Sequence, residues 1–143
     1  MLKGISPLLS PRLLATLCRM GHGDEIVLAD AHLPAHSHAR LALRADGCTV
    51  ETLLRALLPL FELDSYDGPP AALMAPVAGD ATDPAIELAY RQALDELAPG
   101  APDFAHLERG AFYERARGAF AVVQTGDTTP YGNLLLRKGV TPS

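Results

Sequence analysis

The sequence is short of cysteine and of positive charge. Its 143 residues include two cysteines, Cys18 and Cys48, and 12 Lys and Arg against 17 Asp and Glu, which gives a formal net charge of −5. Two cysteines do not make the dense disulfide framework of a small secreted domain, so we expect buried free thiols in a reducing cytoplasm. The negative balance leaves no basic stripe to neutralise phosphates, which argues against a nucleic-acid partner.

Long hydrophobic runs and several common enzyme motifs are also absent. No apolar stretch reaches the roughly 18 residues of a membrane span, and none near the start is long enough for a signal peptide. We therefore expect a cytoplasmic protein with no membrane partner. The sequence has no Gly-x-Ser-x-Gly elbow, no P-loop and no G-x-G-x-x-G after its first predicted strand. These absences argue against a hydrolase with a nucleophilic serine and against a nucleotide-binding enzyme.

What the sequence does contain is the composition of one globular domain over residues 1–143. Hydrophobic residues make up 48% and charged residues 20% of the chain, which is the ordinary globular range. A chain of 15.2 kDa is expected to bury about two-thirds of its unfolded surface. We find no internal repeat, low-complexity tract or linker that would divide it.

Hydrophobic periodicity predicts alternating helices and strands. The predicted helices are residues 11–20, 50–60, 83–97 and 111–119, and the predicted strands are 25–29, 41–43, 71–77, 120–124 and 134–137. Residues 30–38 are predicted to form a polar loop, and Cys18 is placed on the apolar side of the first helix. The alternation predicts an α/β layered domain with a largely parallel sheet, whose site lies in loops at the carboxyl ends of strands.

Residues 21–38 hold the densest polar cluster. Four of the five histidines fall there, namely His22, His32, His36 and His38, and Asp30 follows the first predicted strand. Histidine suits proton transfer near neutral pH, and the glycines on both sides of His22 let the backbone approach a ligand closely. The plainer interpretation is that His22 is a surface or hydrogen-bonding residue of a turn.

The same histidines raise the alternative of a metal site, because imidazoles are common ligands of zinc and similar ions. Pro34 interrupts any helix that would align His32 with His36. The sequence also has no H-E-x-x-H or Cys-x-x-Cys partner. We therefore expect no metal at His32, His36 and His38.

A second polar group lies toward the end of the chain, at Arg109, Tyr113 and the string Tyr131, Gly132 and Asn133. An amide, a phenol and a guanidinium on loops are suited to hold sugar hydroxyls, which need fixed donors and acceptors. The alternative is structural: Tyr113 and the two residues after it decorate a helix, and residues 131–133 form the turn before a last strand.

Four segments resemble the L-fucose mutarotase family, nearly end to end. They are GHGDEIVLADAHLPAHS (21–37), PLFELDSY (59–66), AFYERARGAFAVVQTGD (111–127) and YGNLLLRKGVTP (131–142). The D-ribose pyranases of the same superfamily are a more distant resemblance, because they typically lack the Asp-Ala-His-x-Pro-Ala-His form found here at residues 30–36.

The resemblance implies an α/β subunit in a ring-shaped homo-oligomer, expected to be a decamer, with sugar sites near subunit boundaries. By motif match, the proton donor falls on His22, and the substrate-binding positions fall on Asp30, Arg109, Tyr131, Gly132 and Asn133. The implied activity is interconversion of the α and β anomers of L-fucose. Mutarotation needs only proton transfers, so we expect no cofactor. A pyranase-type activity and a non-catalytic sugar-binding protein remain as alternatives.

Overall fold

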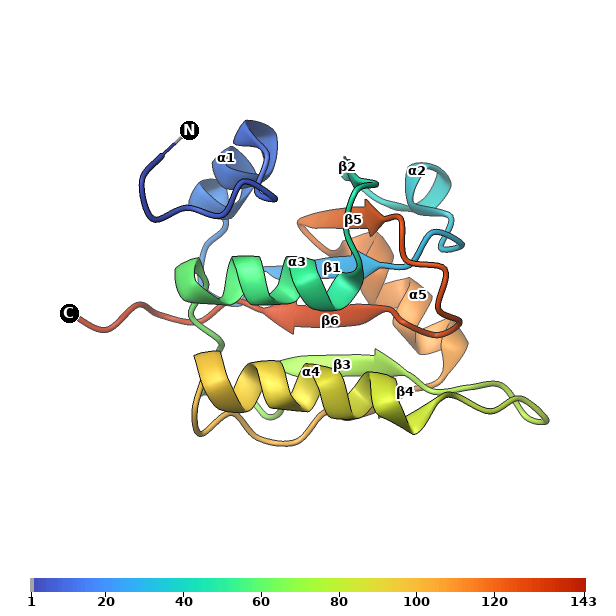
Figure 1. Ribbon diagram of the computed structural model, residues 1–143. Coiled ribbons are helices and arrows are strands. Elements are labelled where there is room, and N and C mark those ends of the chain that lie inside the picture. Colours follow the sequence, from blue (N-terminus) through green and yellow to red (C-terminus); the bar gives the residue numbers. More distant parts are fainter. Residues whose placement is uncertain (1) are drawn as a thin grey trace.

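A computed structural model describes residues 2–143. Six strands form one sheet in the order β2-β5-β1-β6-β3-β4, and helices lie on both of its faces (Figure 1). The strands are β1 (Glu25–Ala29), β2 (Ala42–Ala45), β3 (Ala71–Met74), β4 (Ala105–Leu107), β5 (Ala121–Thr125) and β6 (Leu134–Arg137). The helices are α1 (Pro11–Arg19), α2 (Ala35–His38), α3 (Val50–Leu57) with a 3₁₀ turn (Leu58–Leu60), α4 (Pro84–Leu97) and α5 (Arg109–Gly118).

Two helices begin where the sequence provides a cap. The Ser10 hydroxyl accepts a hydrogen bond from the N–H of Leu13 at 3.1 Å, and the Asp83 carboxylate accepts one from Ala85 at 2.9 Å. A proline follows each cap, at a position where a helix has no use for a backbone N–H. Both predicted helix starts are therefore confirmed. No helix within residues 2–143 combines the length and apolar character needed to cross a membrane.

The sheet is buried on both faces, which makes three layers. In β1, Ile26 and Leu28 face a core shared with α1, α3 and α4, whereas Val27 and Ala29 face a second core beneath α5. All four side chains have 0% exposure. This explains why the strand is a continuous apolar block, since alternate residues enter different cores.

The sheet is mixed, which corrects the expectation of a largely parallel one. β2, β5 and β1 are parallel neighbours and so are β3 and β4, but β6 is antiparallel to both β1 and β3. The reason lies in residues 126–133, which join β5 to β6 without a helix. A parallel return needs a crossover of a dozen or more residues, so β6 turns back along β1.

Two further expectations were wrong, the loop over residues 30–38 and the apolar placement of Cys18, and one strand was not predicted. Residues 35–38 are a short helix, α2, and residues 105–107 are a strand, β4, which is the outermost strand on one side of the sheet. Cys18 is exposed, because α1 buries the i, i+3, i+4 set that begins at Leu13 and Cys18 lies about 100° beyond its last member. Cys48 is half-buried, and its thiol donates to the carbonyl of Ala45.

Candidate active site

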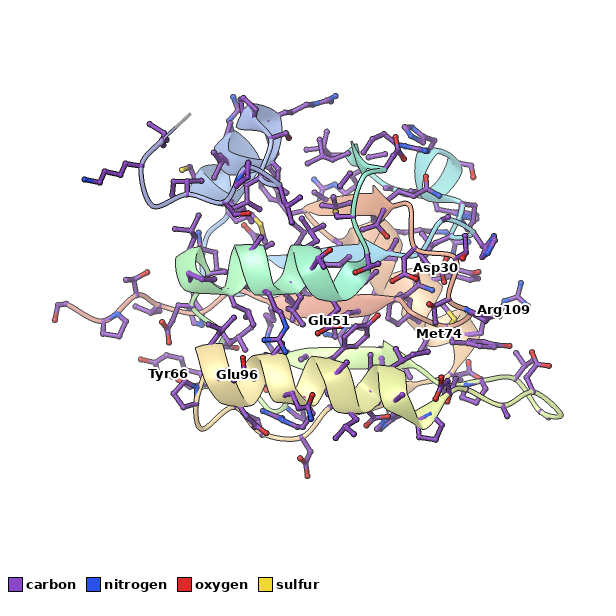
Figure 2. All side chains as sticks on the ribbon, viewed as in Figure 1. Asp30, Glu51, Tyr66, Met74, Glu96 and Arg109 are labelled. Atoms are coloured by element: carbon purple, nitrogen blue, oxygen red, sulfur yellow. The ribbon has the colours of Figure 1, made fainter. Side chains whose placement is uncertain are left out.

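Several strand ends meet at one edge of the sheet. Asp30 follows β1, Met74 ends β3, Arg109 follows β4 as the first residue of α5, and Asn133 precedes β6. Figure 2 shows Asp30, Met74 and Arg109 gathered at this edge, on the right of the view. Because β6 runs antiparallel to β1, with Leu134 opposite the end of β1, the residues before β6 arrive beside Asp30.

A pocket of about 210 Å³ opens at this edge. Its lining residues are Asp30, His32, Leu33, Met74, Arg109, Tyr113, Pro130, Tyr131 and Asn133. The volume is below the usual range for drug-sized ligands and suits a smaller polar molecule. Of the substrate-binding residues expected from the sequence, the structure brings all but Gly132 into the lining, and Gly132 lies between two lining residues.

Asp30 and Asn133 are locked together at the base of this pocket. The Asn133 side chain accepts from the backbone N–H of Asp30 at 2.8 Å and donates to the carboxylate of Asp30 at 3.0 Å. The other carboxylate oxygen accepts from the N–H groups of His32 and Leu33, each at 2.9 Å. Both side chains are at least 96% buried, since their exposures are 3% and 4%. The carboxylate is thus a fixed acceptor whose remaining lone pairs can meet a ligand hydroxyl.

Tyr131 is set against the pocket by an unusual backbone. Its φ of 59° is the only positive value at a non-glycine residue within residues 2–143. Its phenol donates to the Asp80 carboxylate at 2.6 Å, and this hydrogen bond raises the pKa of Tyr131. The next residue, Gly132, is held by its carbonyl, which accepts from the Tyr90 hydroxyl at 2.7 Å. A Cβ at Gly132 would lie 3.1 Å from a backbone oxygen of Thr129, so a side chain there is crowded.

Arg109 provides the positive charge of the pocket. Its guanidinium lies over the ring of Tyr113, 5.6 Å from the ring centroid, an arrangement in which the ring attracts the cation. The side chain is exposed, and within residues 2–143 it forms neither a hydrogen bond nor an ion pair. Its five N–H donors are therefore available to a ligand.

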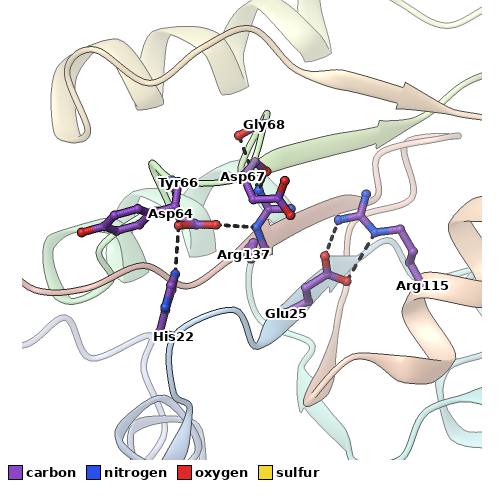
Figure 3. Close-up of polar contacts among 8 residues, drawn as sticks. All are labelled: His22, Glu25, Asp64, Tyr66, Asp67, Gly68, Arg115 and Arg137. Atoms are coloured by element: carbon purple, nitrogen blue, oxygen red, sulfur yellow. Dashed lines mark hydrogen bonds and ion pairs between the residues drawn. The ribbon is translucent and has the colours of Figure 1, made fainter.

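His22 lies at the other edge of the sheet, before β1. Its Nε2 is 3.2 Å from a carboxylate oxygen of Asp64, and the second oxygen of Asp64 accepts from Arg137 at 2.8 Å (Figure 3). The backbone N–H of Tyr66, with Arg137 and His22, lowers the pKa of Asp64 to about 2. The five residues of β1, at about 3.3 Å each, separate His22 from Asp30. One chain therefore does not bring these two predicted site residues together.

The clustered histidines do not converge. His32 lines the pocket, His36 is exposed on α2, and the ring of His38 stacks on that of Tyr113 with centroids 5.9 Å apart. In the part of the chain that the structure describes, no group of three or more His, Cys, Asp or Glu side chains is arranged to hold a metal ion.

The apolar part of the pocket, which includes Leu33 and Met74, was not predicted from the sequence, and His32 was singled out there only as a candidate metal ligand. Nothing local distinguishes Met74 from a core residue, because it belongs to a short apolar run in which all four residues are buried. Only its place at the end of β3 puts it at the site. The signal for His32 was present, since it lies two residues beyond the strand end at Asp30.

A larger cavity of about 480 Å³ lies beside Asp64 at the opposite edge. Its lining is apolar or proline-rich apart from the carboxyl groups of Glu62 and Asp64 and the hydroxyl of Ser65. It holds no guanidinium or amide side chain to complement hydroxyl groups. The smaller pocket, with its carboxylate, amide, phenol and guanidinium, is the better candidate for a polar ligand.

Known proteins match this chain over almost its whole length. Residues 3–141 match the model of the RbsD / FucU transport protein family. The fucose mutarotase of Streptococcus pneumoniae, solved in complex with L-fucose, is 44% identical with a TM-score of 0.92, over 99% of this chain and 100% of that chain. FucU from Bifidobacterium longum is 41% identical with a TM-score of 0.93, over 98% and 100%. Bacillus subtilis RbsD, complexed with D-ribose, is 24% identical with a TM-score of 0.76, over 99% of this chain and 100% of that chain. At this identity the match shows that the two chains share a fold.

Proposed function

Since this chain belongs to the RbsD / FucU family, we propose that it is an L-fucose mutarotase, an isomerase that interconverts the α and β anomers of L-fucose. The observation that carries the proposal is the 44% identity, over 99% of the chain, to a fucose mutarotase solved with L-fucose. The pocket supports it, because a carboxylate, an amide, a phenol and a guanidinium converge on a small space. The lower identity to a ribose-bound relative makes fucose the preferred sugar over ribose.

The reaction breaks and re-forms one ring C–O bond, and each of these steps is accompanied by two proton transfers. One proton is given to the ring oxygen while one is removed from the anomeric hydroxyl, so the ring C–O bond breaks and a free aldehyde forms. Rotation about the bond to the aldehyde carbon exposes its other face, and closure returns both protons. Positioned acids and bases each contribute about 10²- to 10⁴-fold, which is sufficient for a reaction that already proceeds in water.

We assign the proton donor to His22, and the binding of the sugar to Asp30, Arg109, Tyr131, Gly132 and Asn133. Asp30 and Asn133 are buried and fixed by mutual hydrogen bonds, so they present acceptors and donors without reorganisation. Arg109 adds donors that no group within residues 2–143 occupies. Gly132 contributes backbone, because its neighbours leave little space for a side chain.

The site requires two copies of the chain under this assignment. His22 precedes β1 and Asp30 follows it, so β1 holds them about 16 Å apart or more. A proton donor must come within hydrogen-bond reach of its substrate. We therefore propose that His22 of one subunit completes the Asp30 pocket of a neighbour, in a ring-shaped homo-oligomer that we expect to be a decamer.

The activity itself is tested by saturation-transfer NMR between the two anomeric protons of L-fucose. We expect the protein to accelerate exchange well above the rate in buffer, and L-fucose to exchange faster than D-ribose. Faster exchange of ribose between pyranose and furanose forms would assign the pyranase reaction instead. Binding of fucose with exchange at the buffer rate would assign a sugar-binding protein.

The shared site is tested by mixing two inactive variants, His22→Asn and Arg109→Ala, and reassembling them together. Each variant is expected to lose most activity alone. In a random mixture about one interface in four combines an intact His22 with an intact pocket, so about a quarter of wild-type activity should return. A mixture that shows only the average of its two parents would place the whole site within one chain.

A further inference from the structure

The loop between β3 and α4 is tied to the candidate pocket through one side chain. Residues 75–83 project beyond the edge of the sheet where the pocket opens, on the right of Figure 1, and residues 76–83 are all exposed. Between Ala75, whose N–H donates to Leu107, and the cap of α4, the only hydrogen bonds from this loop to other segments of residues 2–143 go to the phenol of Tyr131. The loop and the phenol therefore fix each other's position.

These contacts use up the one hydrogen that the Tyr131 phenol can donate. That hydrogen goes to the Asp80 carboxylate at 2.6 Å, the short distance of a hydrogen bond to an ionised acceptor. The N–H of Val77 faces the phenol oxygen at 3.4 Å, which is a long contact. A phenol oxygen has acceptor capacity besides its donor hydrogen, and Tyr131 lines the pocket. Toward a ligand the phenol can therefore only accept.

No other carboxylate in the part of the chain that the structure describes holds this hydrogen. Two more acidic residues, Asp83 and Glu87, lie near Tyr131 around a small recess. Asp83 caps α4 and accepts from its first turn, and Glu87 pairs with His106. Asp80 is thus the residue that decides where the phenol hydrogen points.

We propose that Asp80 is a positioning residue for sugar recognition: it holds the hydrogen of the Tyr131 phenol away from the pocket, so that the phenol oxygen accepts a hydrogen bond from one hydroxyl of the sugar. This inference deepens the proposed function and rests on it, since Tyr131 is there assigned to bind the sugar. The arrangement selects a donor at one position of the ligand. A hydroxyl satisfies it, whereas a group that only accepts leaves the phenol oxygen unpaired, and a site built for a hydroxyl rejects such analogues.

The test compares L-fucose with analogues in which each hydroxyl in turn is replaced by fluorine, which accepts weakly and cannot donate. In the wild type, we expect the fluorine to weaken binding about 10-fold at the position that faces Tyr131. In Asp80→Ala the phenol hydrogen is free to turn to the fluorine, so the loss at that position should shrink by about 3-fold or more. Dissociation constants from NMR titration measure both. Fluorine effects that are the same in the two proteins at every position would overturn the proposal.

The kinetics of L-fucose itself give a second measurement. Asp80→Ala should raise KM about 3- to 10-fold, the worth of one hydrogen bond, and leave kcat nearly unchanged, because binding and not proton transfer is altered. A fall in kcat with KM unchanged would contradict a role in recognition.

Asp83→Asn is the matched control. It removes the same charge from the end of the same loop, does not touch the phenol, and keeps a good helix cap. It should behave as the wild type with every analogue. Asp80→Asn is the conservative variant, and its amide oxygen can still take the phenol hydrogen, so most of the wild-type discrimination should return. The same change in Asp83→Asn as in Asp80→Ala would assign the effect to the charge of the loop and overturn the proposal.

A titration of the phenol tests the contact without any sugar. Asp80 is the first cause that raises the pKa of Tyr131, and the charge of Arg109 acts in the opposite direction. The absorbance of the phenolate, with Tyr131→Phe subtracted to remove the other tyrosines, should show Tyr131 ionising at a lower pH in Asp80→Ala than in the wild type. An unchanged titration would overturn the role of Asp80 and leave the proposed function standing. Anomer exchange at the buffer rate in the wild type would instead overturn the proposed function.

Discussion

The backbone of Tyr131 carries strain at the place where the pocket needs a phenol. A φ of 59° is in the left-handed region, which is costly for residues other than glycine and is found preferentially at functional sites. The hydrogen bond to Asp80 and the anchoring of Gly132 by Tyr90 hold that conformation. The backbone of Tyr131 and that of Gly132 thus together fix the orientation of the Tyr131 side chain.

His22→Asn tests the central residue of the mechanism. Asparagine keeps a polar side chain but cannot carry a proton between groups near neutral pH. Exchange of the anomers should slow by roughly 10²- to 10⁴-fold, or about 3 to 5 kcal/mol of transition-state stabilisation. Fucose affinity should fall much less, because the other contacts of the pocket remain, and both quantities can be measured by NMR.

His36→Asn is a suitable control for that variant, since His36 is exposed on α2 and does not line the pocket. It should behave as the wild type. If His22→Asn retains its exchange rate, His22 is a turn residue and the assignment is wrong. If binding disappears together with the rate, His22 chiefly anchors the sugar.

At the scale of elements, the loop between β5 and β6 is fastened to α3 through Asp127. One carboxylate oxygen accepts from the N–H of Val50, the first residue of α3, at 3.1 Å, and the other accepts from the N–H of Thr129 at 3.0 Å. The same loop continues to Tyr131 and Asn133. The position of the pocket residues therefore depends on the start of a helix on one face of the sheet.

Asp127→Ala should loosen this connection. Removing the charged acceptor takes the hydrogen-bond partner from two backbone N–H groups, those of Val50 and Thr129, and should lower the free energy of unfolding by about 1 to 3 kcal/mol. Sugar affinity should weaken as well, because Tyr131 and Asn133 lose their support. Asp46→Ala is the control: Asp46 pairs with Arg44 at the surface, where substitutions usually change stability by less than about 0.5 kcal/mol. Urea unfolding and fucose titration measure both, and equal stabilities would contradict the role of Asp127.

At the scale of the whole molecule, Asp64 links stability to acid pH. Its pKa is lowered from 3.8 to about 2, by the N–H of Tyr66 first and then by Arg137 and His22. Because the folded state favours the ionised form, its contribution is present above pH 3.8 and is lost as the pH falls toward 2. Urea unfolding across this interval should show a flatter pH dependence for Asp64→Asn than for the wild type. Equal slopes would contradict the linkage.

A site shared between subunits also predicts the size of the assembly in solution. A shared site needs a neighbour at every pocket, so light scattering should give a mass far above the 15.2 kDa of one chain, and a decamer is expected. Dilution that dissociates the oligomer should abolish activity at the same concentration. A monomer with full activity would contradict a site built from two subunits.

Local sequence determined the starts of helices, the buried strand β1 and the identity of the family. Caps such as Ser10 and Asp83 act within three residues of themselves, and the apolar block of β1 indicates burial on both faces without reference to any partner. The match of the family model over residues 3–141 confirms the resemblance that the motifs carried. These features could be predicted because their causes lie within a short stretch of chain.

Only the tertiary structure decided which residues meet. Asp30 and Asn133 share two hydrogen bonds although 103 positions separate them, and they meet because β6 runs antiparallel to β1. His22 and Asp30 lie eight positions apart in sequence, yet β1 places them at opposite edges of the sheet. Strand direction is fixed by the length of the connection and by the free edge of the neighbouring strand, neither of which is encoded in the residues of the strand itself.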